Sequence, residues 1–262
     1  MTHTVNDSRP WWLWPNLLAL DAPAVAVTWQ LFFASVAGIA VPLTATVVLG
    51  LVVWGVYLAD RGLDARLGAI STDRHRAAGR NFVAWTATAT AALISAGVLA
   101  FTALPLSYLR AGLAVATVSV GYFIVVHVAR AERLLGRGLK EASVGLVFAL
   151  GAAVPLIAVR EIDTSWTMGV VAFAGLCWLN CLLISVWEEA PGRRPSVFVV
   201  IGAGTVAVGA AIGAAVPVAF AVAASTAALM GLHALRSRIS VRAARVWADG
   251  VLLSPLLVVV CS

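Results

Sequence analysis

Long stretches of the chain contain no Asp, Glu, Lys or Arg, and this feature constrains the fold more than any other. They cover residues 22–59, 81–109, 111–129, 142–159, 164–187 and 195–235. A helix needs about 20 apolar residues to cross the hydrocarbon core of a bilayer. Because lipid offers no hydrogen-bond partner to the backbone, a spanning segment must satisfy its own N–H and C=O groups, as a helix does. The sequence therefore predicts an all-α polytopic membrane protein.

The lengths of these stretches set the expected number of spans. Residues 22–59 and 195–235 are each long enough for two helices, and a last, shorter run at 246–260 carries Asp249. Helix breaks are expected at Gly and Pro positions, namely near Gly38 and Pro42, before Pro105, and from Gly213 to Pro217. We expect about nine spans in a single membrane domain, residues 1–262. Two related halves at about 16–130 and 138–235 precede a final helix at about 246–260.

Charge gives the expected orientation. Only 11% of the residues are charged, against roughly 25% in soluble domains. Of the 18 Lys and Arg, all but Arg110 and Arg160 fall on one side of the predicted spans. Because short basic loops face the cytoplasm, we expect a cytoplasmic N-terminus, an external C-terminus and a location in the cell (inner) membrane. The net charge of +6 then follows from topology, and the expected partners are membrane lipids and no nucleic acid.

Acidic residues at or inside spans are candidate functional groups, because lipid makes them costly. Asp21 and Asp249 lie inside predicted spans, and no role for either is fixed by the sequence. Asp249 is either a site residue or the partner of Arg245, four residues earlier on the same helix face. Asp60 and Asp64 end the second span and share one face. Two such carboxylates can hold Mg²⁺ against a phosphate group, or they form a solvated helix end paired with nearby arginines.

Two spaced motifs, four helices apart, carry a family resemblance. The first reads Val56-Tyr57-x-x-Asp60-x-x-x-Asp64, and it is followed by the loop Arg74-His75-Arg76-Ala77-Ala78-Gly79. The second reads Asn180-Cys181-x-x-Ile184-x-x-x-Glu188 at the end of the sixth span. The pattern resembles the UbiA-type intramembrane prenyltransferase superfamily, which has nine helices and aspartate-rich motifs at these two places. Val56, Tyr57, Cys181 and Ile184 stand where the family carries Asn or carboxylates.

The resemblance implies a Mg²⁺-dependent reaction of a prenyl diphosphate with a lipophilic acceptor, or its cyclisation, in a UbiA-like bundle. The implied metal ligands are Asp60, Asp64 and Glu188, which are also, with Asn180, the implied catalytic residues. The implied substrate-binding residues are Tyr57, Arg61, Arg74, Arg76, Arg130 and Lys140. Mg²⁺ and arginines would stabilise the leaving diphosphate while the allylic C–O bond ionises.

Two other functions remain open from the sequence. Because Cys181 and Ile184 replace carboxylates of the second motif, the chain is alternatively a non-catalytic UbiA-fold protein that binds an isoprenoid or assists another membrane enzyme. The third hypothesis is a small transporter, a class in which acids inside spans mark the transport path.

Overall fold

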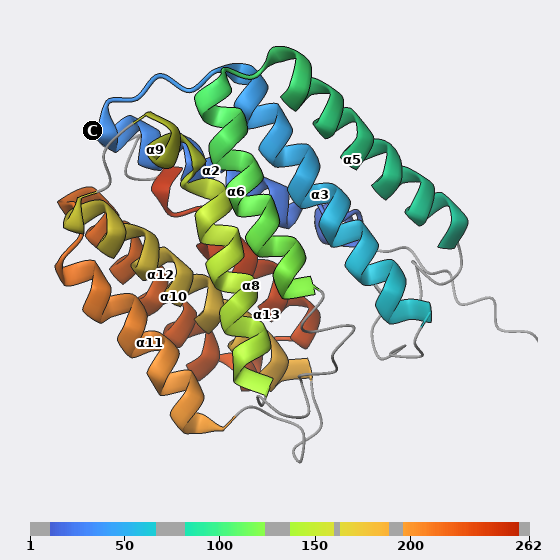
Figure 1. The fold of residues 1–262 in the computed structure, drawn as a ribbon. Coiled ribbons are helices and arrows are strands. Elements are labelled where there is room, and N and C mark those ends of the chain that lie inside the picture. Colours follow the sequence, from blue (N-terminus) through green and yellow to red (C-terminus); the bar gives the residue numbers. More distant parts are fainter. Residues whose placement is uncertain (1–10, 67–81, 124–136, 160–162, 189–195, 257–262) are drawn as a thin grey trace, which may run out of the picture.

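The computed structural model describes residues 11–66, 82–123, 137–159, 163–188 and 196–256, and all regular elements in these ranges are helices (Figure 1). Four helices are long and apolar enough to cross a membrane, and they contain Leu43–Leu63, Phe82–Ala103, Thr164–Glu188 and Val216–Ala234. Two shorter apolar helices cover Leu106–Gly121 and Val197–Ile212. The chain is therefore an all-α membrane protein, as the uncharged stretches predict.

The first half of the chain follows the predicted breaks. Its helices are α1 (Trp14–Leu17), α2 (Asp21–Ala37), α3 (Leu43–Arg66), α5 (Phe82–Ala103) and α6 (Leu106–Phe123). The break after α2 is confirmed, because Gly38 ends the helix in the left-handed region with φ 68°, where glycine has no steric penalty. The predicted end before Pro105 is also confirmed, but the next helix begins directly after this proline, at Leu106 rather than at residue 111.

The second half contains α8 (Arg137–Ala152), α9 (Val154–Val159), α10 (Thr164–Glu188), α11 (Val197–Ile212) and α12 (Val216–Ala234). The single helix predicted at 142–159 is thus two helices, with Pro155 in the first turn of the second. In a first turn the backbone N–H has no acceptor within the helix, so the N–H that proline lacks costs no hydrogen bond there. The turn predicted between Gly213 and Pro217 is confirmed by the gap between α11 and α12.

The final helix differs from the prediction. The structure places α13 at Val241–Val251, which begins earlier than the expected 246, and residues 257–260 of the expected helix lie outside the described residues. Ser240 caps it by accepting a hydrogen bond from the Ala243 backbone nitrogen at 3.2 Å. Eleven residues give a rise of about 16 Å, roughly half of a bilayer core. The expectation of a spanning helix was based on the apolar run from residue 246, whereas α13 begins before that run, is amphipathic and buries Arg245 together with Ala248.

Helix α10 lies at the centre of the bundle and packs against α8, α11, α12 and α13. Glycines allow two of these approaches: a Cβ at Gly145 would lie 2.7 Å from a backbone oxygen of α10, and one at Gly175 would lie 2.7 Å from a backbone nitrogen of α11. Phe173 of α10 stacks on Trp29 of α2 with ring centroids 4.0 Å apart. These contacts join both halves of the chain in one core, with α5 on the outside against α3 (Figure 1).

Candidate functional site

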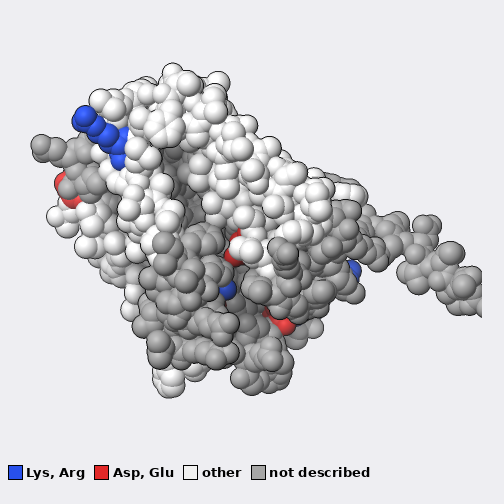
Figure 2. Space-filling view, turned by 45° about the vertical axis from the view of Figure 1, so that its right-hand side comes forward, with Lys and Arg blue, Asp and Glu red and all other residues white. Residues whose placement is uncertain are grey.

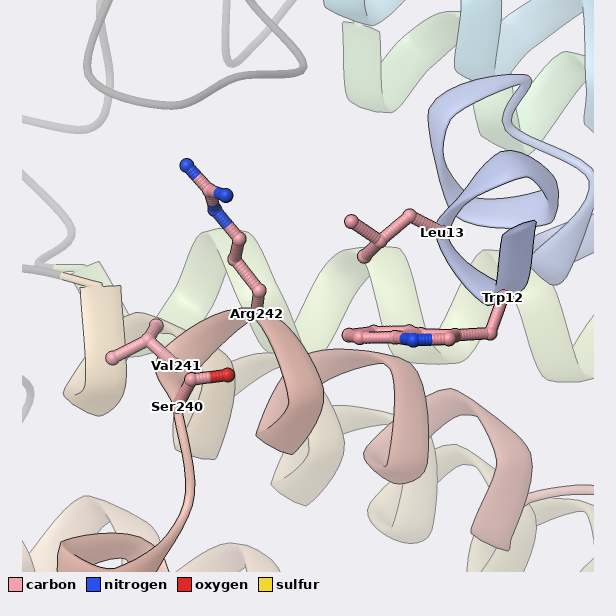
Figure 3. A pocket seen from close by; sticks show the side chains of 5 residues that line it. All are labelled: Trp12, Leu13, Ser240, Val241 and Arg242. Carbon is pink, nitrogen blue, oxygen red and sulfur yellow. The ribbon is translucent and has the colours of Figure 1, made fainter. Parts of the chain in front are cut away.

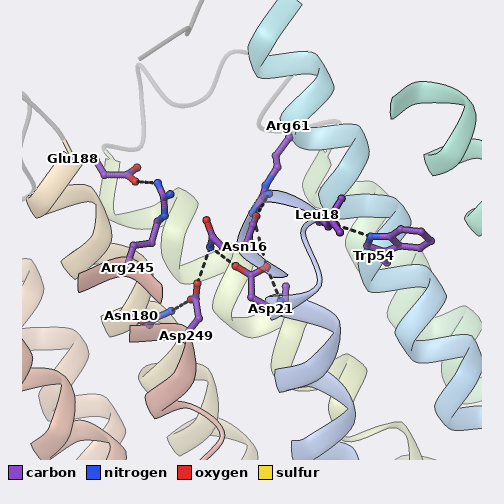
Figure 4. Close-up of polar contacts among 10 residues, drawn as sticks. Asn16, Leu18, Asp21, Trp54, Arg61, Asn180, Glu188, Arg245 and Asp249 are labelled. Carbon is purple, nitrogen blue, oxygen red and sulfur yellow. Dashed lines mark hydrogen bonds and ion pairs between the residues drawn. The ribbon is translucent and has the colours of Figure 1, made fainter. Parts of the chain in front are cut away.

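A buried polar cluster lies between α3, α10, α13 and the short N-terminal helix α1 (Figure 4). It begins with Arg61, whose side chain is 4% exposed. Arg61 Nη1 donates to the backbone oxygen of Asn16 at 2.6 Å, and Trp54 Nε1 donates to that of Leu18 at 3.0 Å. Both acceptors are carbonyls at or just after the C-terminal end of α1, where intrahelical donors run out, and the Asn16 carbonyl also accepts from the Ala19 backbone nitrogen at 3.3 Å. Side chains of α3 therefore fix the N-terminal segment against the bundle.

The side-chain amide of Asn16 joins two carboxylates from opposite ends of the sequence. Its Nδ2 donates to Asp21 Oδ2 at 2.5 Å and to Asp249 Oδ2 at 3.5 Å. Asn180 Nδ2 donates to the other oxygen of Asp249 at 3.2 Å. Asp21 also faces Arg61, with Oδ1 3.8 Å from Nη2. The two acids with no role fixed by the sequence therefore lie together, in contact with two residues that the resemblance places in the site.

Glu188 lies two helical turns beyond Asn180 on the same face of α10, and this face packs against α13. The Glu188 carboxylate forms an ion pair with Arg245, which lies one turn before Asp249. Because the two helices run in opposite directions, their interface carries two successive polar contacts (Figure 4). These are Glu188 with Arg245 and Asn180 with Asp249. Arg245 therefore pairs with Glu188, and the suggested pairing of Arg245 with Asp249 is not the one formed.

Three of the predicted site residues meet in this cluster. They are Asn180, Arg61 and Tyr57, whose ring centroid lies 5.0 Å from the Arg61 guanidinium carbon. Asp60 is half-buried near the end of α3, and Lys140 is half-buried in the first turn of α8. Asp64 belongs to α3, but its side chain is not described. Arg74, Arg76 and Arg130 lie outside the described residues.

The sequence prediction missed one central residue and one partner. Asn16 was not considered, although it is the one polar side chain in the segment from Trp11 to Leu20. Arg245 was considered only as a partner of Asp249. Between Asn16 and Asp21, Ala19 has φ 59°, a left-handed conformation that costs a residue with a Cβ about 1–2 kcal/mol. The turn that brings Asn16 beside Asp21 is therefore held in place by the surrounding contacts.

The surroundings of the cluster are apolar. Figure 2 shows that the described residues on this face carry few charged side chains, with a few charged atoms near the centre of the view. The buried core beside the cluster includes Trp29, Phe173, Leu179 and Leu252. In such surroundings electrostatic interactions are stronger than in water.

A cavity of about 430 Å³ lies between the N-terminal segment and the start of α13 (Figure 3). It is lined by Trp12, Leu13, Ser240, Val241 and Arg242. Its volume is within the range of small-molecule sites, about 300–1,000 Å³. Its lining combines apolar side chains with the Ser240 hydroxyl and the Arg242 guanidinium, which extends away from α13 in Figure 3.

Comparisons with protein-family models, with curated proteins and with solved structures give no match to this chain.

Proposed function

We propose that this chain is a membrane enzyme that ionises a prenyl diphosphate and transfers the prenyl group to a lipophilic acceptor, or lets it cyclise, in a divergent UbiA-like bundle. The observation that carries the proposal is the convergence of the two motif helices on one buried polar cluster. Tyr57 and Arg61 of α3 and Asn180 of α10 lie at this cluster. In Figure 4, Arg61 of α3 and Asn180 of α10 lie on opposite sides of Asn16. Both belong to the C-terminal halves of their helices, and these helix ends are the ones that the basic loops assign to the cytoplasmic side of the inner membrane.

The residues for Mg²⁺ fit this reaction in part. Asp60 and Asp64 are one helical turn apart on α3, an arrangement that can hold Mg²⁺ together with phosphate oxygens. Glu188 fits less well, because its carboxylate already pairs with Arg245. When bound, Mg²⁺ would neutralise charge on the leaving diphosphate. The apolar bundle would exclude water from the allylic cation, and the face of Tyr57 offers it electrostatic stabilisation.

A specific observation favours a second candidate, a non-catalytic isoprenoid-binding or accessory protein. Both polar residues of the second motif are engaged by α13, Asn180 with Asp249 and Glu188 with Arg245. With these contacts in place, the second motif contributes no carboxylate to a metal shared with α3. A protein of this kind would bind a prenyl diphosphate without turning it over.

The test is diphosphate release by the purified full-length protein in lipid nanodiscs, from a series of prenyl diphosphates, with and without Mg²⁺. Asp60→Asn is the informative variant. Asp163→Asn is the matched control, because it makes the same chemical change at the opposite end of α10 and keeps an acceptor for the Trp166 backbone nitrogen. We expect release that requires Mg²⁺, is lost in Asp60→Asn and is kept in Asp163→Asn.

Other outcomes separate the candidates. Saturable prenyl diphosphate binding without release would support the non-catalytic protein. Neither binding nor release across the series, with lipophilic acceptors present, would rule out both.

A further inference from the structure

The carboxylates of Asp21 and Asp249 are close neighbours inside the apolar bundle. A single nitrogen, Asn16 Nδ2, lies 2.5 Å from an oxygen of Asp21 and 3.5 Å from an oxygen of Asp249, so these two oxygens are within about 6 Å of each other. A donor placed between two carboxylates occupies the position that a cation takes when carboxylates share a metal ion. The backbone around this position is fixed, because Arg61 holds the Asn16 carbonyl at 2.6 Å.

Two buried amide oxygens at the same place have no hydrogen-bond partner within the described part of the chain. They are Asn16 Oδ1 and Asn180 Oδ1, on side chains that are 2% and 6% exposed. Buried polar atoms are nearly always satisfied, so two orphan oxygens in one cluster require an explanation, and a missing ion is one of the usual ones. Both amides are directed at the carboxylates, since the Nδ2 of each donates to Asp249.

A half-turn of an amide about its Cβ–Cγ bond exchanges Oδ1 and Nδ2 with almost no change in shape. For Asn16 and Asn180 this rotation would turn the orphan oxygens toward the carboxylates. Oxygen facing oxygen is repulsive unless a cation lies between them. With a cation present, the same rotation lets both amide oxygens bind the ion in exchange for the hydrogen bonds that the Nδ2 groups now donate, and the ion screens the repulsion between two neighbouring carboxylates.

We propose that Asn16, Asp21, Asn180 and Asp249 form an oxygen-lined site for a hard metal cation. Asn16 Nδ2 now lies between the two carboxylates, at the position proposed for the ion. Carboxylate and amide oxygens select hard cations such as Mg²⁺, Ca²⁺ and Na⁺ and disfavour soft transition metals. The ligands come from three separate parts of the chain, namely the N-terminal segment, α10 and α13, so the cation ties these parts together.

This site goes beyond the proposed enzymatic function, since it uses neither Asp60 nor Asp64 and needs no diphosphate. Its consequence is that the cation stabilises the folded protein with no substrate present. A ligand that binds the native state raises the melting temperature in a concentration-dependent way. Cation binding is therefore measurable whether or not the chain is an enzyme.

The experiment follows thermal unfolding of the full-length protein in nanodiscs of zwitterionic lipid, after treatment with a chelator. Mg²⁺, Ca²⁺ and Na⁺ are titrated separately in a potassium buffer, and Mn²⁺ binding is counted by electron paramagnetic resonance as a direct probe. We expect at least one of the three cations to raise the melting temperature in a saturable manner. Asp249→Asn should weaken binding of this cation by about tenfold or more, and the control Asp163→Asn, which lies outside both acidic sites, should leave cation binding unchanged.

A second variant keeps the test informative if Asp249→Asn does not fold. Asn16→Asp places a third carboxylate between the first two, so it should bind the cation about tenfold more tightly than the wild type or better. Stabilisation by Na⁺ alone would support the site and identify a monovalent ion, whereas stabilisation by Mg²⁺ or Ca²⁺ would identify a divalent one. The inference is overturned if no cation shifts the melting temperature, or if Asp249→Asn and Asn16→Asp leave the shift as it is in the wild type.

Discussion

Replacing Arg245 by glutamine would test whether Glu188 serves the structure of the bundle or a metal ion. The two side chains form an ion pair and are only 5% and 16% exposed. Removing one partner of a buried ion pair leaves the other charge buried without a partner, and this lowers the free energy of unfolding by about 3–5 kcal/mol. Because Glu188 keeps some contact with solvent, we expect the lower value, about 3 kcal/mol, for Arg245→Gln.

That loss of stability can be expressed as a melting temperature. For a chain of this size, 1 kcal/mol corresponds to about 2–4 °C, so Arg245→Gln should melt about 6–12 °C below the wild type. The double variant Glu188→Gln/Arg245→Gln leaves no stranded charge, and it should return to within about 1 kcal/mol of the wild type. Intrinsic tryptophan fluorescence in nanodiscs, recorded at one scan rate, measures the melting temperatures of the wild type, Arg245→Gln, Glu188→Gln and the double variant.

Two results would refute this reasoning. If Arg245→Gln melts with the wild type, the ion pair contributes nothing to stability. If the double variant is as unstable as the sum of the single variants, the two side chains act independently. If Glu188 were instead a metal ligand, Glu188→Gln would abolish Mg²⁺-dependent turnover while Arg245→Gln preserved it.

Two further predictions concern packing and hydrogen bonding. Gly175→Ala should lower the free energy of unfolding by about 1–3 kcal/mol, because its Cβ would lie 2.7 Å from a backbone nitrogen of α11. The control Gly204→Ala has no atom within 4 Å of its Cβ and should be neutral or slightly stabilising. Equal melting temperatures for the two variants would contradict this account of the α10–α11 contact. Trp29→Phe should lower the free energy of unfolding by about 1–3 kcal/mol, because it leaves the Leu252 carbonyl without the buried hydrogen bond that Trp29 Nε1 now donates at 2.8 Å. An unchanged melting temperature would show that this hydrogen bond does not anchor the segment after α13.

Much of the fold follows from local features of the sequence. Runs without charge predict apolar helices, and Gly38 and Pro105 mark real helix ends. These signals are local because each residue's cost in lipid, or its backbone preference, depends little on its neighbours in space. The eight-residue separation of Asn180 and Glu188, two steps of four, also places them on one face of α10, as predicted, since helix geometry alone decides this.

The tertiary structure decided what each of these residues meets. Asn16 and Asp249 are 233 residues apart in the chain and share a hydrogen bond. No local sequence pattern predicts such a contact. The final helix illustrates the same limit: the apolar run predicted its start near residue 246, whereas α13 begins at Val241 and packs in the bundle with Arg245 paired to Glu188 of another helix. The cost of burying a charge is set by its partner in space. The sequence therefore determined that the chain is a bundle of apolar helices, and the packing of those helices determined which polar groups form its centre.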